Sequence, residues 1–315
     1  MSIDVIIPTY KPQKGFIELI DKLKTQTLLP ERIIVINTDE ECWDAFVSSL
    51  EITGILSDIE VYHVTKNDFD HGRTRNIAMN KSNADICVMM TMDAIPADDM
   101  LLENIVKPLE DKGMAASYAR QLAYENSSVT EKLTRQFNYP DKSVVKTAAD
   151  IESMQIKAFF CSNVCCAYNM QIFNELGGFV DRTVFNEDMI YAANAIRAGY
   201  KIAYCSEAKV YHSHEYTGVQ QFRRNFDNGV SHAQFPQVFE GISQDDEGRR
   251  MVKQILKKLM RMGHPFKAIG YIYDCGCKYT GFKLGLRYEK LPGWIVKRCT
   301  SQRSYFDQIH FIKMK

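Results

Sequence analysis

The first third of the chain alternates between short apolar runs and segments whose apolar residues recur at helical spacing. This alternation limits the fold more than any other feature. The runs are short and end in polar residues, which predicts buried strands. We expect strands at residues 3–10, 31–40, 59–65 and 85–96, and helices at 16–26, around 41–50 and near 74–82. Strands that alternate with helices predict an α/β fold with a mostly parallel, doubly wound sheet flanked by helices.

The middle of the chain is less regular. Apolar residues at helical spacing predict a helix over residues 187–200 that begins at Asn186. The remaining segments are expected to be extended, at residues 113–121, 158–169 and 201–216.

Polar residues at the strand ends are the first candidates for a site, because ligands of such sheets bind beyond the carboxyl ends of the strands. Thr9 and Tyr10, residues 37–39 and Asp93 each lie at the end of a predicted strand. Asp93 stands out, since a carboxylate at the end of an apolar strand costs free energy unless water, a cation or a donor meets it. The alternative for Asp93 is an exposed cap before the sequence PADDMLLENI.

Residues 69–78, FDHGRTRNIA, gather two arginines, a histidine, a glycine and an asparagine before an apolar, helix-like segment. The stretch is either a polar turn that caps a helix or a binding site for an anion. Arginine suits the second role because its planar fork contacts two oxygens at once, and Gly72 permits a tight turn. Neither G-x-G-x-x-G nor G-x-x-x-x-G-K-[ST] occurs, so a nucleotide would have to be bound by side chains.

Two further motifs carry chemistry. His212 and His214 share one face of an extended segment, and with a distant carboxylate they would form a divalent-metal site; ordinary surface histidines are the alternative. Residues 186–188, Asn-Glu-Asp, begin a helix, where one carboxylate is a general base or the acids merely complement the helix dipole. Cys275 and Cys277 lack a second cysteine pair at zinc spacing, and we expect no metal there.

Composition bounds the class of protein. The chain has 315 residues with 45% hydrophobic residues and no net charge, which suits one large α/β domain with an appendage, or two domains. Residues 249–315 hold 16 Lys/Arg and 3 Asp/Glu, so this tail carries +13 and the preceding body −13. Cysteines in apolar runs indicate a reducing compartment. No secretory leader and no apolar run of ~18 residues is recognised, so we expect no spanning helix.

Taken together, these residues resemble glycosyltransferase family 2, which has the GT-A fold. The opening VIIPTY, the strand-end NTDE, the TRN turn, Asp93, the ED before a helix and the later histidine follow that family's order across residues 3–230. Nine pieces resemble the bacterial rhamnosyltransferases of that family, which assemble rhamnose-containing cell-wall polysaccharides and O-antigens. They are FDHGRTRNIA, DAIPAD, YARQ, FNYP, SNVCCAY, LGGF, NEDM, AGYKIAY and HSHEYT. The family's frequent Asp-x-Asp is reduced here to Asp93 alone.

The resemblance implies a nucleotide-sugar donor, dTDP-β-L-rhamnose, and direct displacement that inverts the anomeric centre to give an α-L-rhamnoside. It implies the following roles. The donor's nucleotide is bound by Thr9, Asn37, Asp39, Arg75, Asn76 and Asp93; Mn²⁺ or Mg²⁺ is held by Asp93, His212 and His214; the general base is Asp188; and the sugar or acceptor pocket is lined by Arg120, Gln121, Asn163 and Glu187. Glu187 is expected to serve positioning.

The resemblance also implies an acceptor, a growing glycan on a lipid carrier at the cytoplasmic leaflet. We therefore expect a GT-A domain over residues 1–230 and a basic helical segment over 231–315 that contacts an anionic membrane from the cytoplasmic side. Residues 249–262 predict a basic amphipathic helix for this contact, with a packing or dimer helix as the alternative. Competing functions are a family 2 transferase for another sugar, such as a UDP-hexose, and a non-enzymatic anion-binding module. No nucleic-acid motif is present.

Overall fold

The computed structural model describes residues 1–50, 54–243 and 245–307, and it divides into two compact units. Unit 1 contains residues 1–124, 139–182 and 187–213, and unit 2 contains residues 125–138, 183–186 and 214 onward. This division differs from the expected boundary at residue 230, because unit 2 begins earlier and takes in two short segments from the middle of the chain.

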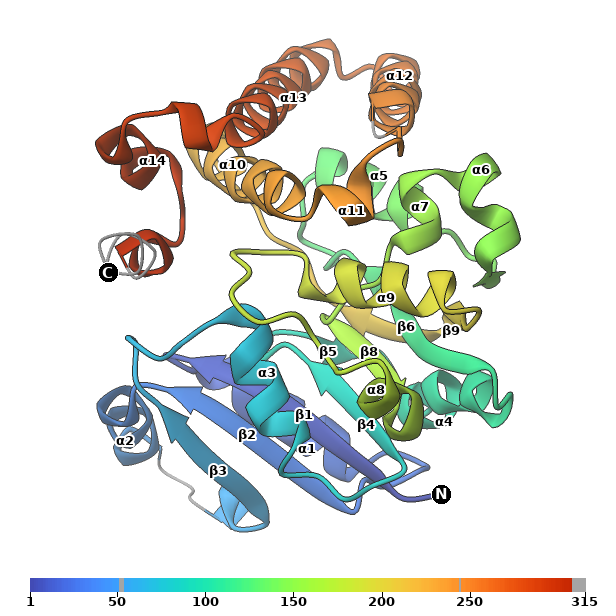
Figure 1. Ribbon diagram of the computed structural model, residues 1–315, viewed down its shortest axis with the longest axis vertical. Coiled ribbons are helices and arrows are strands. Elements are labelled where there is room, and N and C mark those ends of the chain that lie inside the picture. The colour runs from blue at the N-terminus through green and yellow to red at the C-terminus, as the bar shows by residue number, and fades with distance from the viewer. Residues whose placement is uncertain (51–53, 244, 308–315) are drawn as a thin grey trace. The chain divides into compact units, whose positions relative to one another are not determined.

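The centre of unit 1 is a sheet of nine strands within the described residues, in the order β3-β2-β1-β4-β8-β6-β9-β5 with β7 paired to β9 (Figure 1). The strands are β1 (Ile3–Tyr10), β2 (Arg32–Thr38), β3 (Ile59–Val64), β4 (Ile86–Met90), β5 (Ile95–Pro96), β6 (Met114–Leu122), β7 (Val144–Lys146), β8 (Cys165–Asn169) and β9 (Lys201–Tyr211). Strands β3, β2, β1 and β4 are parallel, as the alternation predicts. Strand β8 is antiparallel to β4 and β6, so the second half of the sheet is mixed. The α/β fold class is confirmed.

Helices cover both faces of this sheet (Figure 1). Those of unit 1 are α1 (Lys14–Lys24), α2 (Glu40–Ser48), α3 (His71–Met79), α4 (Leu101–Val106), α6 (Ile151–Met154), α7 (Ile156–Phe159), α8 (Met170–Glu175) and α9 (Glu187–Arg197). Ile3, Val5 and Ile7 of β1 share one apolar core with residues of α1, α2 and α4. Ile6 points to the opposite face and is also fully buried. Burial on both faces explains why these strands are continuous apolar runs.

Two expected strands differ from the structure. Residues 85–96 form β4 and β5, separated by a turn that contains Asp93. Residues 158–169 begin at the end of helix α7 and become strand β8 only at Cys165. Short apolar runs have no periodicity long enough to separate a buried helix end from a buried strand.

Unit 2 is helical over the described residues. Its helices are α5 (Val129–Asn138), α10 (Gly218–Gln234), α11 (Pro236–Phe239), α12 (Asp245–Arg261), α13 (Pro265–Gly285) and α14 (Gly293–Cys299). Helices α10 and α13 lie backbone to backbone: a Cβ on Gly281 would be 2.2 Å from the carbonyl oxygen of Phe222, and one on Gly285 would be 2.1 Å from that of Phe226. This close packing ties α10 to the C-terminal helices and explains why unit 2 begins before residue 230.

The apolar face of α12 is buried inside unit 2. Ile255 and Leu259 pack with Leu133 of α5 and Tyr271 of α13 in one apolar cluster. The structure therefore shows the packing alternative for this helix, and its apolar stripe is not exposed to a membrane. Among the described residues, no helix is long and apolar enough to cross a membrane.

Candidate active site

Asp188 lies in the first turn of α9 with both carboxylate oxygens engaged. Oδ2 accepts the backbone N–H of Asn163 over 2.9 Å, and Oδ1 accepts that of Met189 over 2.8 Å. The side chain is only half-buried. Burial, followed by the charge of Glu187, raises the pKa of Asp188 to about 7. The two N–H donors lower this pKa, but they do not outweigh burial and charge. A carboxylate with a pKa near neutral pH is suited to general base catalysis.

Glu187 is buried and held by charged and polar partners. Its Oε1 accepts from Nδ2 of Asn163 over 2.9 Å and lies 3.2 Å from Nε of Arg75. Burial pushes the pKa of Glu187 upward, but Arg75, His71 and Asn163 outweigh it and leave the pKa below its ordinary value. Two adjacent carboxylates therefore have different roles: Glu187 stays ionised while Asp188 titrates near neutral pH.

Asn163 links the two carboxylates, and Tyr168 fixes its orientation. The hydroxyl of Tyr168, a fully buried residue of β8, donates to Oδ1 of Asn163 over 2.7 Å. Since that oxygen is occupied, the amide nitrogen faces Glu187. The sequence prediction included Asn163 but missed Tyr168 and His71. Both lie inside quoted motifs, SNVCCAY and FDHGRTRNIA.

The stretch FDHGRTRNIA caps helix α3 and places Arg75 beside Glu187. Helix α3 begins at His71, and Oδ1 of Asp70 caps it by accepting the N–H groups of Gly72 and Arg73 over 3.0 and 2.9 Å. Gly72 is required for close approach, because a Cβ there would lie 1.8 Å from the carbonyl oxygen of Val180. Our tight-turn explanation for this glycine was wrong, since its backbone is helical.

Arg75 and Asn76, which are predicted at the donor's nucleotide, are held by contacts within the protein. We expected Arg75 at the nucleoside, but the structure places its buried guanidinium against Glu187 and the carbonyl oxygen of His71. Asn76 donates to the carbonyl oxygen of Phe179 over 2.8 Å and accepts the N–H of the same residue over 2.9 Å. These bonds tie α3 to the segment after α8 and account for Asn76 without a ligand.

The remaining nucleoside candidates lie at the carboxyl ends of β1 and β2. Thr9 and Asn37 are register partners, and Oγ1 of Thr9 donates to Oδ1 of Asn37 over 3.1 Å. Both are buried, and the Asn37 amide also donates to the carbonyl oxygen of Asp39. Asp39 has a partly exposed carboxylate, and its hydrogen bond with Lys66 lowers its pKa. Its φ of 74° is uncommon for a non-glycine residue.

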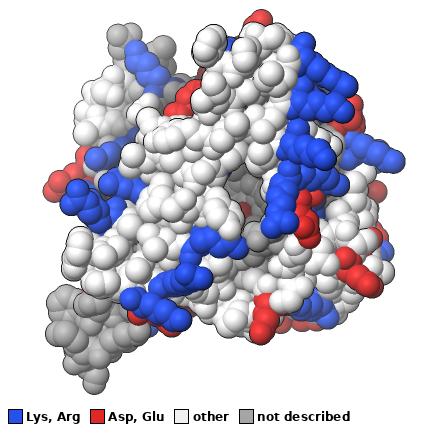
Figure 2. All heavy atoms as spheres, turned by 90° about the horizontal axis from the view of Figure 1, so that it is seen from above, with Lys and Arg blue, Asp and Glu red and all other residues white. Residues whose placement is uncertain are grey.

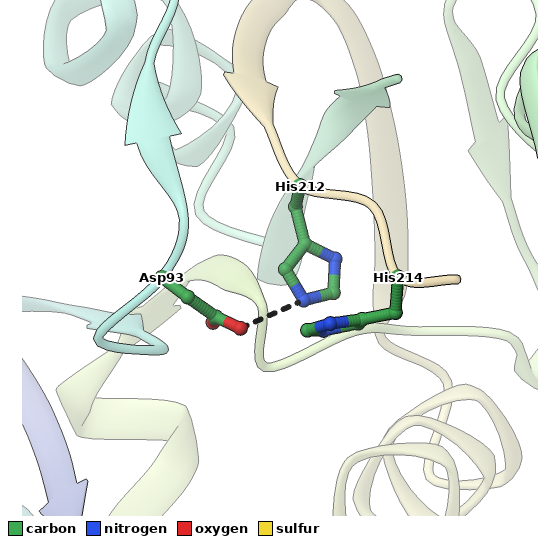
Figure 3. A group of neighbouring side chains, drawn as sticks. All are labelled: Asp93, His212 and His214. Atoms are coloured by element: carbon green, nitrogen blue, oxygen red, sulfur yellow. Dashed lines mark ion pairs between the residues drawn. The ribbon is translucent and has the colours of Figure 1, made fainter. Parts of the chain in front are cut away.

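The metal candidates come together as expected (Figure 3). Asp93 lies in the turn between β4 and β5, and His212 directly follows β9. Strand β5 pairs antiparallel with β9, Ile95 opposite Tyr211, and this pairing brings the two residues together. Oδ2 of Asp93 lies 3.7 Å from Nε2 of His212. One ligand atom from each of Asp93, His212 and His214 lies within 4.8 Å of the others.

Gln121 orients His212 for this role. Its Oε1 lies 2.9 Å from Nδ1 of His212, and its amide nitrogen donates to Ser162 over 3.0 Å. An amide oxygen only accepts, so Nδ1 carries the proton and Nε2 presents a lone pair toward Asp93. His214 is the first residue of unit 2, and the two-residue link to His212 accounts for its nearness. A carboxylate beside neutral imidazoles fits a divalent cation.

Two of the expected pocket residues lie on β6, where the sheet changes register. Pairing with β9 shifts between Ala119 and Arg120, from Ala119 opposite Cys205 to Arg120 opposite Lys209. The shift is an irregularity that leaves residues 206–208 of β9 without partners on β6, and such irregularities re-aim the residues that follow. Gln121 is buried and occupied by His212 and Ser162, so its role is to position other side chains.

A mixed α/β sheet with a carboxylate pair at the start of α9 and a candidate metal-ligand group beyond its strand ends is typical of the GT-A glycosyltransferases. The mannosyltransferase PcManGT from Pyrobaculum calidifontis, solved with GDP-Man and Mn²⁺, shares this fold with a TM-score of 0.52 and 14% identity, covering 99% of this chain and 86% of that one. Residues 4–177 match the model of glycosyl transferase family 2, and the chain belongs to this family.

Two relatives match over the whole chain. The O-antigen chain rhamnosyltransferase RfbN of Salmonella typhimurium is 37% identical, with 100% of this chain and 99% of the relative covered. The O-antigen chain rhamnosyltransferase WbaN of Salmonella anatum is 34% identical, with 100% and 98% covered. The resemblance to family 2 and to its rhamnosyltransferases is thereby confirmed.

Proposed function

We propose that the protein transfers L-rhamnose from dTDP-β-L-rhamnose to a hydroxyl of a lipid-linked glycan, with inversion, to form an α-rhamnoside. The observation that carries the proposal is similarity across the full chain to two O-antigen chain rhamnosyltransferases, at 37% and 34% identity. This similarity extends beyond the matched family region, which ends at residue 177, and so covers the segments that contain Asp188, His212 and His214.

Asp188 is the proposed general base. It is half-buried with a pKa of about 7, whereas Glu187 is buried and saturated by Arg75 and Asn163. Asp188 is thus the carboxylate of the pair that is able to accept the proton of an acceptor hydroxyl. General base assistance typically contributes about 10²–10⁴ in rate. Direct attack of the activated hydroxyl on the anomeric carbon gives the inverted product.

Asp93, His212 and His214 are the proposed ligands of Mn²⁺ or Mg²⁺. When bound, such an ion supplies Lewis-acid stabilisation of the diphosphate leaving group. Gln121 keeps His212 in the tautomer whose Nε2 is free of a proton. The geometry of this group supports the proposal, because Asp93 alone replaces the family's frequent acidic pair and the histidines complete the donor set.

Asp39 is the proposed contact to the donor's nucleoside. Its carboxylate is partly exposed at the end of β2 and neighbours Cys42, which helps to line a cavity of about 480 Å³. The cavity is also lined by Lys11 and Pro12 of the loop after β1. Thr9 and Asn37, which are hydrogen-bonded to each other, hold the carboxyl ends of β1 and β2 together next to Asp39.

The remaining part of the proposal concerns the acceptor and its place in the cell. We propose a growing polysaccharide on a lipid carrier at the cytoplasmic face of the membrane, with the protein bound peripherally. The net charge of +13 over residues 249–315 supports contact with anionic lipid.

A donor panel tests the proposal. Purified protein is incubated with dTDP-rhamnose, UDP-galactose or UDP-N-acetylglucosamine and a lipid-linked glycan extract, and nucleoside diphosphate release and labelled glycan are measured. We expect turnover with dTDP-rhamnose, and an anomeric coupling in the NMR spectrum of the product that indicates the α-linkage. Turnover with a UDP-sugar and none with dTDP-rhamnose would show that the donor is a UDP-sugar. Retention of configuration at the anomeric carbon would contradict the role of Asp188.

A further inference from the structure

Helix α13 exposes a long apolar face to solvent. Phe266 is 86% exposed, Ile269 64% and Ile272 54%, and two tyrosines are similarly exposed, Tyr273 at 63% and Tyr279 at 60%. At 100° per residue these five side chains lie on one side of the helix. The opposite side carries Ala268, Tyr271, Gly281 and Gly285, which are buried in unit 2. We call the exposed set the α13 face.

The large side chains of the α13 face meet one charge, that of Lys283, which lies on the same side of the helix with its Nζ 5.3 Å from the centroid of the Tyr279 ring. Within α13, which the structure describes throughout, the charged residues between Phe266 and Thr280 are Lys267, Asp274 and Lys278. Helical spacing puts all three on the other side of the helix. Exposed apolar areas of this kind are uncommon on monomeric soluble proteins and mark contact with a partner or a membrane.

Basic side chains flank one end of this face. Met260 at the end of α12 and Met262 in the turn before α13 are 59% and 52% exposed, beside the exposed residues Lys257, Lys258 and Arg261 of α12. Figure 2, which views the molecule from the side of these helices, shows Lys and Arg gathered in a column beside a broad uncharged area. Apolar and aromatic side chains bordered by lysine and arginine are the composition of a segment that lies in a membrane interface.

We propose that the α13 face docks the protein on an anionic membrane surface, with the neighbouring lysines and arginines contacting lipid phosphates. Charge favours lipid over a second copy of the chain. A symmetric dimer through this face would bring the basic helices α12 and α13 of two copies together, and their like charges would repel. The helix sits on the surface and does not span, since α13 lacks the hydropathy of a spanning helix. This inference rests on the proposed function, in which the acceptor is lipid-linked.

Vesicle flotation tests the surface separately from the chemistry. The probes are vesicles of phosphatidylglycerol with phosphatidylcholine, and of phosphatidylcholine alone. The variant Phe266→Ser/Ile269→Ser/Ile272→Ser removes apolar area from the α13 face. The matched control, Leu29→Ser/Val145→Ser, removes residues of unit 1 that are 59% and 50% exposed. Circular dichroism and melting confirm that each variant is folded.

We expect wild type and control to float with the anionic vesicles, and the α13 variant to partition at least tenfold more weakly. Its turnover of dTDP-rhamnose with a short water-soluble acceptor should remain within twofold of wild type. Wild-type flotation by the α13 variant would overturn the proposal. So would loss of a wild-type dimer with unchanged flotation, which would make the face an interface between copies. Failure of the donor assay with intact flotation would refute the proposed function and leave this surface standing.

Discussion

The replacement Asp188→Asn is expected to inactivate the protein and to stabilise it in a pH-dependent way. Raising the pKa of Asp188 from 3.8 to about 7 means that the folded state holds a proton which the unfolded chain has already lost. Stability from this residue is therefore fully present below pH ~4 and is lost as the pH rises toward 7. Asparagine is neutral throughout and avoids this loss.

The magnitude follows from the shift. At about 1.4 kcal/mol per pKa unit, the ionised form costs the fold up to about 4 kcal/mol above pH 7. Water screens part of this because Asp188 is only half-buried. Asparagine also accepts only one of the two N–H groups, from Asn163 and Met189, that the carboxylate accepts, a loss of about 1 kcal/mol at every pH. We expect a net gain of about 1–2 kcal/mol at pH 8, and a Tm higher by about 2–8 °C.

The assay compares wild type and Asp188→Asn by thermal melting at pH 5 and pH 8, and by single-turnover kinetics. The Tm advantage of the variant should grow from pH 5 to pH 8, while turnover falls by ~10² or more and donor affinity stays near wild type. Wild-type kcat/KM should rise with pH and level off above about 7, since the base must be ionised. A Tm advantage that does not change with pH would refute the electrostatic argument, and wild-type turnover in the variant would refute the base.

Other variants test the groups around Asp188 and the metal candidates. Glu187→Gln should lower turnover less than Asp188→Asn does. It should also shift the acid limb of the pH profile to lower pH, because it removes the charge that, after burial, raises the pKa of Asp188. An inactive Glu187→Gln variant and an active Asp188→Asn variant would reverse the two roles. Tyr168→Phe should cost about tenfold in kcat, on the scale of one hydrogen bond, and should move that same limb, which a mere packing change would leave in place. Asp93→Ala should abolish Mn²⁺ binding in calorimetry with Tm unchanged within a few degrees, and Gln121→Ala should weaken it about 10–100-fold; full activity in EDTA would rule out the metal assignment. Lys253→Glu/Lys257→Glu/Lys258→Glu should weaken flotation with anionic vesicles most at low salt, and an effect independent of salt would argue against lipid charge.

The sequence predicted the parallel half of the sheet closely because β1, β2 and β4 are buried on both faces, whereas the edge strand β3 is only partly buried. A run such as residues 3–10 is apolar throughout, ends in polar residues and has no competing periodicity. The antiparallel insertion of β8 between β4 and β6 could not be predicted, since it depends on pairing between strands far apart in the chain. The two compact units differ from the predicted domain bounds for the same reason: the close approach of α10 and α13 at Gly281 and Gly285 leaves no local signal in the sequence.

The sequence predicted which residue types form the candidate site, but not which of these residues contact one another. The family resemblance implied that Asp93 lies with His212 and His214, and the β5–β9 ladder brings Asp93 and His212 together. Arg75 was expected at the donor's nucleotide because arginine's planar fork suits an anion and because the family resemblance implied that role. The sequence could not show its ion-pair partner, Glu187, which the fold supplies by placing the start of α9 beside α3.

This pairing explains why two adjacent acids share the start of one helix. An exposed carboxylate in the first turn of α9 would be stabilised in its ionised form by the helix dipole, and would be a weak base. Burial is the main cause that raises the pKa of Asp188, and Glu187, kept ionised by Arg75 and by the amide of Asn163, adds a neighbouring negative charge that raises it further. Asp188 then titrates near pH 7 while its half-exposed side chain stays accessible to an acceptor hydroxyl. Arg75 of the stretch FDHGRTRNIA would thus act on the reaction indirectly, through Glu187, without contacting the sugar.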